Sequence, residues 1–402
     1  MIPFGLKVAV FRMVMAVLKW LVKMVPFPQP TLFQGPGSSL QMCDHIALMG
    51  IKKVMIVTDA MLVKLGLLKD MQQRLEAAGV EVLIFDGVKP DPTIEQIEAG
   101  LKMLNEQHCQ AILAVGGGSS IDAAKVIAAR ATHPKKAVRK MDGMFKLRGP
   151  IFPLYAVPTT AGTGSEVTIA AVVSDPDNHR KSAIMDPKLV PSLAALDGAL
   201  MTGLPAPITA ATGMDALTHA VEAYISANAL PDTDAQALAA TRLIMENLPK
   251  VMENGGDVEA RQKMAMASFL AALAFTRAGV GYVHAISHNL GAYYHTPHGL
   301  ANAIVLPYVL DYSKPECSAR LAELARASGL EGGSDAELAD KFIAHIRALN
   351  QKFGIPEKHA DLRAEDIPAI AKAALKEAHW TYAVPRYMDK RTCQEFIRGL
   401  MA

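Results

Sequence analysis

The stretch AILAVGGGSSIDAAKVIAAR, residues 111–130, decides the fold class of this 402-residue chain. It begins with five apolar residues, passes through three consecutive glycines and continues as an alanine-rich segment. A short apolar run that leads at once into a helix is typical of a buried parallel strand followed by a crossover helix. The stretch therefore predicts an α/β domain built on a parallel sheet.

The same alternation extends in both directions, from about residue 50 to residue 198. Upstream, the apolar segments 52–59 and 80–85 are followed by the helix-like segments 62–79 and 94–108. Short apolar runs separated by helices favour parallel strands with helical crossovers. Three further segments downstream have the composition of strands: PLYAVPTTAG (153–162), TIAAVVSD (168–175) and SLAALD (192–197).

The composition and periodicity of the sequence change after PAPITAATG, residues 205–213. Long segments rich in Ala, Leu and Met with helical periodicity follow, and few of them resemble strands. We therefore expect an α/β plus all-α protein with an amino-terminal extension at 1–26, a dinucleotide-binding α/β domain at 27–203 and a helical metal-binding domain at 204–402.

Composition excludes several classes of protein. An apolar fraction of 51% and a charged fraction of 20% are those of a globular chain. A formal net charge of +2 gives no indication of a nucleic-acid partner. The cysteines Cys43, Cys109, Cys317 and Cys393 are scattered singly, without the spacing of a disulfide framework or a zinc knuckle. A reducing cytoplasm is the expected compartment.

The first 25 residues are unusual because they contain four basic residues and no acidic one, and the first acidic residue is Asp44. Basic residues interrupt the apolar runs, which argues against a transmembrane helix and against a signal peptide. Two interpretations remain: peripheral contact of a helix with an anionic membrane surface, or packing of that helix on its own subunit or a neighbour.

The glycine turn, Gly116 to Gly118, stands where the backbone would approach a ligand closely, with Ser119 or Ser120 as the N-cap of the next helix. Open amides and the helix dipole favour a phosphate there. The pattern is neither a P-loop nor a complete G-x-G-x-x-G, since Ile121 occupies the last position. The alternative is a tight strand-to-helix turn without a ligand.

Asp59 follows the apolar segment that begins at residue 52. A carboxylate at the carboxyl end of a parallel strand would bind a ribose and repel a 2′-phosphate, which favours NAD over NADP. The alternative is an N-cap for the following helix. The hydroxyl-rich loop PTTAGTGSE, residues 158–166, would line the same cofactor.

The third candidate site is a cluster of histidines. On helices, Asp215 and His219 stand one turn apart on one face, as do His284 and His288. His298 lies about 21 Å beyond His284 on a straight helix, too far to share one ion. The chain must therefore reverse, and Gly291, Pro297 and Gly299 are the candidate breaks.

Any one of these histidines is compatible with a hydrogen-bonded core residue. Two helical pairs followed by a further histidine favour a metal site. One carboxylate with several imidazoles suits Fe(II), Zn(II), Co(II) or Mn(II), so the ligands alone do not name the metal.

Four motifs, taken together, resemble the iron-containing (group III) alcohol dehydrogenases, the family that includes lactaldehyde reductase and 1,3-propanediol dehydrogenase. They occur in family order and spacing: GGGSSIDAAK (116–125), PTTAGTGSEVT (158–168), GMDALTHAVEAY (213–224) and GYVHAISHNLGAYYHTPHGLANAIVLP (281–307). The resemblance runs from about residue 30 to the carboxyl terminus and excludes the extension. It implies a dehydroquinate synthase-like fold.

The resemblance also implies roles for particular residues. Metal ligands would be Asp215, His219, His284 and His298, and His288 would contact substrate and relay a proton. Positions around the dinucleotide would be Asp59, Asp91, Gly117, Gly118, Ser119, Asp122, Thr159, Thr160, Thr163 and Lys181.

Two positions depart from the family pattern. The family often has asparagine where Asp91 stands, and His295 occupies a position that is commonly not histidine. His295 would then shape the substrate pocket or offer an alternative ligand.

The implied function is an NAD-dependent, metal-dependent alcohol dehydrogenase or aldehyde reductase acting on a primary alcohol. Fe(II) is the expected metal, with Zn(II) as the alternative, and a homo-oligomer is expected. The alternative interpretations of the sequence are a zinc-type glycerol dehydrogenase, a dehydroquinate synthase-like lyase and a non-catalytic membrane-associated protein of the same fold.

Overall fold

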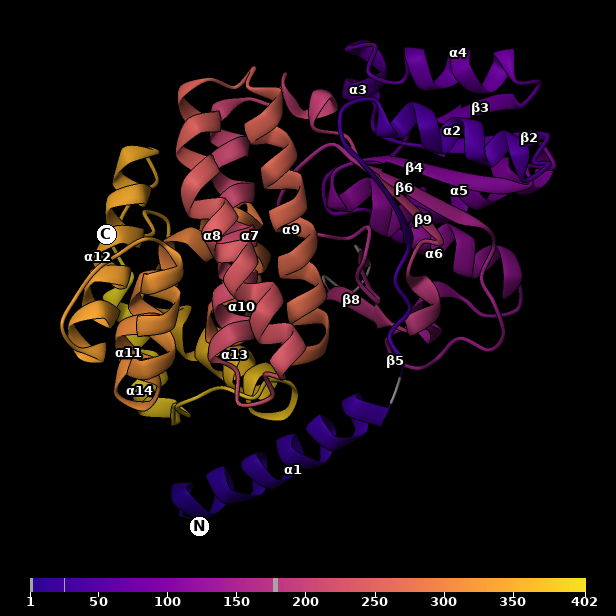
Figure 1. Cartoon of the computed structure of the whole chain (residues 1–402). Coiled ribbons are helices and arrows are strands. Elements are labelled where there is room, and N and C mark those ends of the chain that lie inside the picture. The colour runs from indigo at the N-terminus through magenta and orange to yellow at the C-terminus, as the bar shows by residue number, and fades with distance from the viewer. Residues whose placement is uncertain (1–2, 25, 176–179) are drawn as a thin grey trace. The chain divides into compact units, whose positions relative to one another are not determined.

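The computed structural model describes residues 3–24, 26–175 and 180–402, and it divides into two compact units (Figure 1). The α/β unit comprises Phe27–Leu204 and Gly256–Phe269. The helical unit comprises Met1–Pro26, Pro205–Gly255 and Leu270–Ala402. The division expected from the sequence, at 26/27 and 203/204, stays a prediction about domains, because compact packing alone does not establish independent folding.

The α/β unit is built on a six-stranded sheet in which all neighbouring strands are parallel, in the order β1-β9-β6-β4-β2-β3. A smaller sheet of order β5-β8-β7 pairs β8 parallel to β5 and antiparallel to β7. The strands are β1 (Thr31–Gln34), β2 (Lys53–Val57), β3 (Glu81–Phe85), β4 (Ala111–Gly116), β5 (Gly143–Met144), β6 (Leu154–Pro158), β7 (Ala170–Asp175), β8 (Arg180–Met185) and β9 (Leu193–Leu196).

Five helices belong to this unit by sequence: α2 (Ser38–Leu48), α3 (Ala60–Lys64), α4 (Lys69–Ala77), α5 (Ile94–Glu106) and α6 (Gly118–Thr132). Three short 3-10 helices follow, at Val138–Lys140, Pro187–Leu189 and Gly198–Met201.

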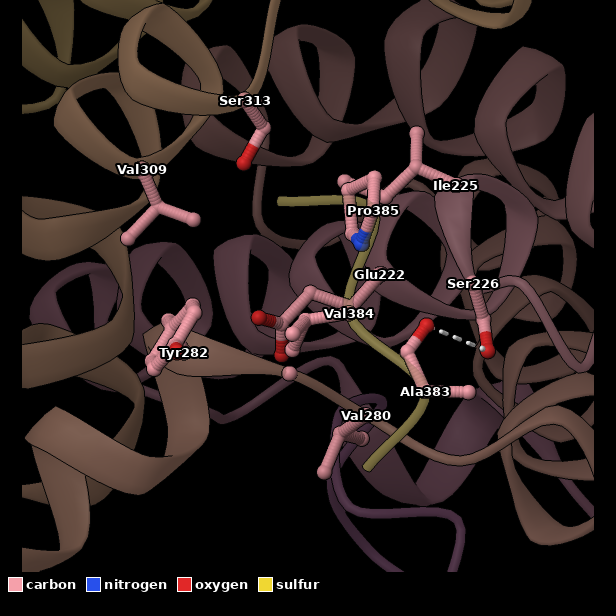
Figure 2. Close-up of a pocket in the computed structure, with 11 residues that line it drawn as sticks. Glu222, Ile225, Ser226, Val280, Tyr282, Val309, Ser313, Ala383, Val384 and Pro385 are labelled. Carbon is pink, nitrogen blue, oxygen red and sulfur yellow. Dashed lines mark hydrogen bonds between the residues drawn. The ribbon is translucent and has the colours of Figure 1, made fainter. Parts of the chain in front are cut away.

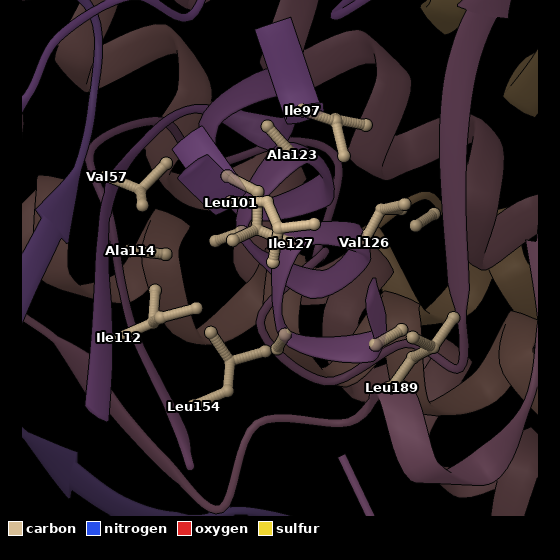
Figure 3. Packing of buried hydrophobic residues seen from close by; sticks show 14 of the residues in the cluster. Val57, Ile97, Leu101, Ile112, Ala114, Ala123, Val126, Ile127, Leu154 and Leu189 are labelled. Atoms are coloured by element: carbon tan, nitrogen blue, oxygen red, sulfur yellow. The ribbon is translucent and has the colours of Figure 1, made fainter. Parts of the chain in front are cut away.

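Apolar residues cover both faces of the large sheet. Side chains alternate along each strand, so Val57 and Ala114 join one core with helices α5 and α6 (Figure 3). Their neighbours Ile56 and Leu113 join a second core with helices α2 and α4. Burial on both faces explains why the strands read as continuous apolar runs rather than as alternating ones.

The predicted strands of this unit are confirmed, but one predicted helix is wrong. Segment 62–79 is broken into α3 and α4, with Gly66 between them at φ 72°. That left-handed conformation suits glycine and cannot continue a right-handed helix. Strands β1 and β8 lack long apolar runs and were not predicted.

The helical unit contains most of the remaining elements. They are α1 (Phe4–Met24), α7 (Ala206–Ile225), α8 (Pro231–Glu253), α10 (Tyr282–Tyr294), α11 (His298–Ala327), α12 (Asp335–Lys352), α13 (Ile367–Thr381) and α14 (Lys390–Gly399). From residue 205 onward, all of it described, the chain forms no strand beyond an isolated bridge between His359 and Met401.

Helix α9 (Val258–Ala278) belongs to both units, since its first half packs with the α/β unit and its second half with the helical unit. Gln262, in the first half, accepts a hydrogen bond from Gly198 N and donates one to Leu196 O, each near the end of β9. A parallel sheet with a helical carboxyl-terminal half confirms the predicted fold class.

Among the residues described, no single helix has the length and apolar composition needed to cross a bilayer. One sharply bent pair, Val258–Ala278 with Tyr282–Tyr294, meets that test by length and composition only.

Candidate functional site

Helix α7 supplies the first two candidate ligands, Asp215 and His219, from consecutive turns of one buried face. The packing around them is close. A Cβ at Gly213 would stand 2.5 Å from Leu248, so glycine lets α8 approach α7 at this level. Helix α7 is therefore closely packed against α8 at the level of its candidate ligands.

Two helices joined by a sharp reversal supply the other candidates. Helix α10 ends at Tyr294, and His295 adopts a left-handed conformation at its carboxyl end. Pro297 then precedes the first residue of α11, His298. The predicted reversal at Pro297 is confirmed.

Gly291 and Gly299 do not break a helix, contrary to the prediction, because each lies within one. Gly299 has a packing role instead. A Cβ there would stand 2.2 Å from Ala211 O on α7, so glycine lets the start of α11 lie against α7. This close contact between α11 and α7 places His298, the residue before Gly299, near Asp215.

The four side chains converge on one point. Oδ1 of Asp215 lies 3.9 Å from Nε2 of His219, 3.8 Å from Nε2 of His284 and 3.6 Å from Nε2 of His298. One ligand atom from each lies within 4.8 Å of the others. All are buried except His298, whose side chain is 39% exposed. The group is thus open on the side of His298.

Asn302, one turn after His298 on α11, marks the point of convergence. Its amide nitrogen donates to Oδ1 of Asp215 at 2.7 Å and lies 3.1 Å from Nε2 of His284 and 3.2 Å from Nε2 of His298. An ionised carboxylate only accepts hydrogen bonds, which places the NH₂ group toward Asp215. Oδ1 of Asp215 and one ring nitrogen each from His284 and His298 therefore surround a single amide nitrogen.

Glu222 fixes the orientation of His284. Its Oε2 accepts a hydrogen bond from Nδ1 of His284 at 2.6 Å, and its Oε1 accepts one from Val283 N at 2.8 Å. With the hydrogen on Nδ1, the neutral ring presents the lone pair of Nε2 toward Asp215. A Cβ at Gly281 would stand 2.8 Å from Oε1, so the absence of a side chain there makes room for the carboxylate.

Burial shifts the pKa values of this pair in opposite directions. Desolvation raises the pKa of Glu222 to about 7, against hydrogen bonds from the backbone that lower it. Desolvation, with the neighbouring imidazoles His219 and His298, lowers the pKa of His284 well below its usual value. His284 is therefore neutral, which is the state that binds metals.

A small cavity lies behind Glu222, lined by Ser226, Tyr282, Ser313 and Val384 among others (Figure 2). Its volume of about 10 Å³ is roughly the space that one water molecule occupies. It is too small for an alcohol, so it is not the substrate site.

His288 stands one turn beyond His284 and outside the group of four. Its ring stacks on His298, with centroids 5.3 Å apart. Nδ1 of His288 donates to Oε1 of Glu377 at 2.8 Å, and the hydroxyl of Tyr382 donates to the same oxygen at 2.7 Å. Burial alone would raise the pKa of Glu377, but its bonds with His288 and Tyr382 lower it overall.

His295, considered from the sequence as an alternative ligand, lies outside the group of four. It is exposed and ends α10 in a left-handed conformation at φ 54°. In the structure, His295 contributes to the reversal of the chain between α10 and α11.

In the α/β unit, the glycine turn joins β4 to α6. Gly116 has φ 153°, and a Cβ there would stand 2.5 Å from Oγ of Ser120. A Cβ at Gly118 would stand 2.8 Å from Thr163, whereas one at Gly117 would meet nothing closer than Thr160 at 3.5 Å. Two of the glycines are thus needed for the fold, and Gly117 is not.

The predicted serine N-cap is wrong. Helix α6 begins at Gly118 with Gly117 as its N-cap, and no side chain caps it. Ser119 and Ser120 lie inside the first turn, because the three glycines start the helix earlier than the serine pattern indicates. Ser120 N donates to Gly117 O at 3.1 Å, whereas the amides of Gly118 and Ser119 precede the first bond of the helix, so the phosphate interpretation is compatible with this geometry.

Asp59 acts as an N-cap. Its Oδ1 accepts from Met61 N at 2.9 Å and from Leu62 N at 3.0 Å at the start of α3. The capping alternative is therefore observed, while the ribose contact stays a prediction. Asp59 nevertheless follows β2, which pairs with β4, so it and the glycine turn share the carboxyl edge of the sheet.

The threonines of the hydroxyl-rich loop lie at the same edge. Thr159 N donates to Gly116 O at 3.0 Å, directly after β6. Thr160 and Thr163 are the nearest side chains to Gly117 and Gly118. The sheet therefore assembles this part of the predicted cofactor set.

Asp122 is partly buried in α6. Its Oδ2 accepts from Val172 N at 2.9 Å, which ties α6 to β7, and its carboxylate also bonds Ser165 of the hydroxyl-rich loop. Two predicted cofactor residues stand apart from that cluster. Asp91 is exposed in a left-handed conformation, φ 55°, before α5. Lys181 pairs through its backbone with Ser174 in the small sheet, and its side chain lies outside the described part.

Sequence reasoning missed Glu222, Asn302 and Glu377. Two of them carry a local signal: Glu222 is three residues after His219, and Asn302 is four residues after His298, so each shares a helix face with a candidate ligand. Glu377 has none, since it meets His288 across 89 residues.

Comparison with known proteins gives a consistent result for both units of the chain. Residues 29–198 match the family described as iron-containing alcohol dehydrogenase, and residues 209–401 match the carboxyl-terminal part of the Fe-containing alcohol dehydrogenase family. A 1,3-propanediol dehydrogenase of Klebsiella pneumoniae is 43% identical, with 91% of this chain and 96% of that protein covered.

An NAD-dependent methanol dehydrogenase of Bacillus methanolicus is 37% identical over 93% of this chain and 99% of its own. The crystal structure of a 1,3-propanediol oxidoreductase superimposes with a TM-score of 0.89 at 40% identity, covering 94% of this chain and all of the other. Together these matches make the chain an oxidoreductase, and it belongs to the iron-containing alcohol dehydrogenase family.

Proposed function

We propose that the protein is an NAD-dependent, metal-dependent dehydrogenase that interconverts a primary alcohol and its aldehyde. The convergence of Asp215, His219, His284 and His298 on one point carries this proposal. The nicotinamide cofactor is supported by the glycine turn and by the methanol dehydrogenase relative, whose name states its dependence on NAD.

Asp215, His219, His284 and His298 would hold the metal. One carboxylate oxygen and three neutral imidazoles form a donor set of the kind that binds divalent iron or zinc. The family favours iron. When bound, the ion would act as a Lewis acid toward the oxygen of the alcohol or aldehyde.

The carboxylate of Glu222 prepares this donor set. It keeps the hydrogen of His284 on Nδ1 and holds the ring, so that Nε2 faces Asp215 without reorganisation. Glu222 itself is held by Val283 N, which limits its movement. Carboxylate–histidine pairs of this kind raise ligand basicity and fix ring orientation.

The dinucleotide would place its pyrophosphate on the first turn of α6 and a ribose near Asp59. The cofactor supplies the hydride chemistry, whereas the protein supplies binding and orientation. Thr159, Thr160 and Thr163 support the same loop, and their hydroxyl groups suit ribose or phosphate oxygens.

His288 would accept the alcohol proton and pass it on. Its Nδ1–H is directed to Glu377, so the neutral ring has its acceptor at Nε2. Glu377 receives a second hydrogen bond from Tyr382, which fixes the carboxylate. The network is suited to a general base whose tautomer is set by a carboxylate.

The expected class of alcohol and the expected assembly rest on resemblance to relatives alone. Relatives named for methanol and 1,3-propanediol indicate small primary alcohols. We also expect this chain to form a homo-oligomer. Sedimentation velocity of the purified protein would measure the size of the assembly.

The decisive experiment is NADH absorbance during incubation of anaerobic, Fe(II)-loaded protein with a series of short and long primary alcohols. Turnover with at least one alcohol or aldehyde is expected, and no change with any of them would overturn the assignment. Parallel loading with Zn(II) distinguishes the zinc-type polyol dehydrogenase, which would be more active with zinc and a polyol.

His288→Ala separates proton transfer from metal binding. Turnover should fall by about 10²–10⁴-fold, the usual contribution of a general base. Bound metal should stay near one per subunit by elemental analysis. Loss of the metal instead would make His288 a ligand and defeat its assignment as a base.

A further inference from the structure

Helix α1 carries two apolar faces, and only one of them is docked. Phe11 and Met15 are buried. The ring of Phe11 lies 4.7 Å from that of His379 and 4.9 Å from that of Trp380, measured between centroids. The helix thus packs on its own subunit through this face.

A hydrogen bond fixes the same helix nearer its carboxyl end, where Nζ of Lys19 donates to Ala227 O at 2.9 Å. Ring packing at Phe11 and the bond from Lys19 hold α1 at two places along its length. Its rotation about its own axis is therefore set by contacts with the helical unit.

The opposite face is exposed and equally apolar. Its large side chains recur at helical spacing and fall within an arc of about 100°, centred opposite Phe11 and Met15. They keep 39% to 67% of their surface exposed. We name this face the outer stripe, which consists of Leu6, Val10, Met13, Val17, Trp20, Leu21 and Met24.

The charges beside the outer stripe are all positive. Lys7, Arg12 and Lys23 are exposed on α1, and no acidic residue precedes Asp44. The rest of the chain contains 37 basic and 39 acidic residues, because four of the 41 basic residues lie in the first 25. Positive charge is therefore concentrated where the apolar surface is exposed.

We propose that the outer stripe binds the surface of an anionic lipid bilayer, with α1 lying in the plane of the interface. A helix of 21 residues extends about 31 Å along that plane. Its apolar side chains enter the boundary between headgroups and acyl chains, while the lysines and arginine reach lipid phosphates. This inference goes beyond the proposed catalytic function and does not depend on it.

Charge complementarity favours a bilayer over a second copy of the chain. A second copy of α1 would bring cations beside cations, since its first 43 residues supply no carboxylate. Lipid phosphates provide negative charge along the whole helix. Trp20 adds an indole ring to the outer stripe, and indole rings favour the headgroup region.

The test measures binding of the full-length protein to vesicles of phosphatidylglycerol and phosphatidylcholine in equal amounts, with pure phosphatidylcholine vesicles as reference. We expect co-sedimentation with the anionic vesicles and release at about 0.5 M NaCl, where charge attraction is screened. Equal pelleting with both vesicle types, or none with either, would overturn the proposal.

Two variants test the two components separately. Met13→Gln/Val17→Gln removes apolar surface without touching the docked face and should weaken binding by at least about tenfold. Lys7→Gln/Arg12→Gln/Lys23→Gln should weaken binding to anionic vesicles by roughly a hundredfold, at about fivefold for each charge. Wild-type binding by either variant would contradict the inference.

Leu48→Gln/Met49→Gln is the matched control. It removes two exposed apolar side chains from α2 and its carboxyl end, far from α1 in sequence, and should leave vesicle binding unchanged. Turnover of a soluble short alcohol should stay within about twofold in all three variants, which shows that they fold.

Sedimentation velocity without lipid identifies the competing occupant. Should Met13→Gln/Val17→Gln reduce the size of the assembly while vesicle binding is absent in the wild type, the outer stripe is a contact between subunits and the lipid proposal is wrong. An unchanged assembly together with lost vesicle binding supports the proposal.

Discussion

In the helical unit, candidate ligands from three helices meet at one point, whereas in the α/β unit the glycine turn comes from consecutive residues of one segment. The first site depends on side chains that are oriented by other side chains, such as Glu222 for His284. The second depends on backbone conformation and on space left by missing Cβ atoms. Substitutions should therefore damage the two sites in different ways.

The largest effect is expected for Asp215→Asn, because it removes the carboxylate on which the three imidazoles converge. Metal affinity should fall on the order of a thousandfold, with turnover lost in parallel. Elemental analysis after anaerobic loading with Fe(II) gives metal per subunit. His295→Asn is the control, since asparagine tolerates a left-handed backbone and this residue lies outside the group; one metal per subunit in Asp215→Asn would refute the ligand assignment.

A smaller effect is expected for Glu222→Gln, which keeps the volume of the side chain and an acceptor for His284 but loses the charge. Metal affinity should fall by about 10–100-fold. Competition with a metal-binding dye measures it. Glu246→Gln makes the same chemical change at an exposed helix position and should have no effect. Equal affinity in the two variants would show that Glu222 only packs.

The glycine turn offers a contrast between neighbours. Gly117→Ala adds a Cβ in ordinary contact distance and should leave the melting temperature unchanged, yet raise the KM for NAD about tenfold if a phosphate sits there. Gly118→Ala drives a Cβ into Thr163 and should cost about 1–3 kcal/mol of stability. Thermal melting and steady-state kinetics distinguish them. An unchanged KM in Gly117→Ala would favour a turn without a ligand.

The smallest effect concerns Glu166 at the end of the hydroxyl-rich loop. Burial raises its pKa to about 7, above the value of about 4.5 expected when unfolded. The folded state therefore binds the proton more tightly, so this contribution to stability is complete below pH 4.5 and is lost as pH rises through 7. In Glu166→Gln, the decrease in the free energy of unfolding between pH 5 and 8 should be smaller than in the wild type by about 1–3 kcal/mol. Urea denaturation at both pH values measures it; parallel profiles in the two proteins would exclude Glu166 as the cause.

Local pattern predicted much of the fold and part of each site. Apolar runs followed by helices gave the parallel strands, because strands buried on both faces need no alternation. Helical spacing paired Asp215 with His219, and Pro297 indicated the reversal that brings His298 back. These features depend on residues close together in the chain.

Other features depend on contacts between distant segments, which local pattern does not encode. Glu222 meets His284 across 62 residues, and Asn302 meets Asp215 across 87. The serine N-cap failed for a local reason, since the glycines allow the helix to begin before Ser119. Tertiary placement of polar side chains is therefore the part that required the structure.

The division of α9 between the units bears on the order in which the protein forms during synthesis. Residues 205–255, which belong to the helical unit, leave the ribosome before 256–269, which complete the α/β unit. Gln262 is needed to bond Gly198 N and Leu196 O at the end of β9. A nascent chain that has reached residue 204 contains all six strands of the large sheet but not Gln262, so we expect these two polar groups at the end of β9 to gain their partner only when α9 has been made.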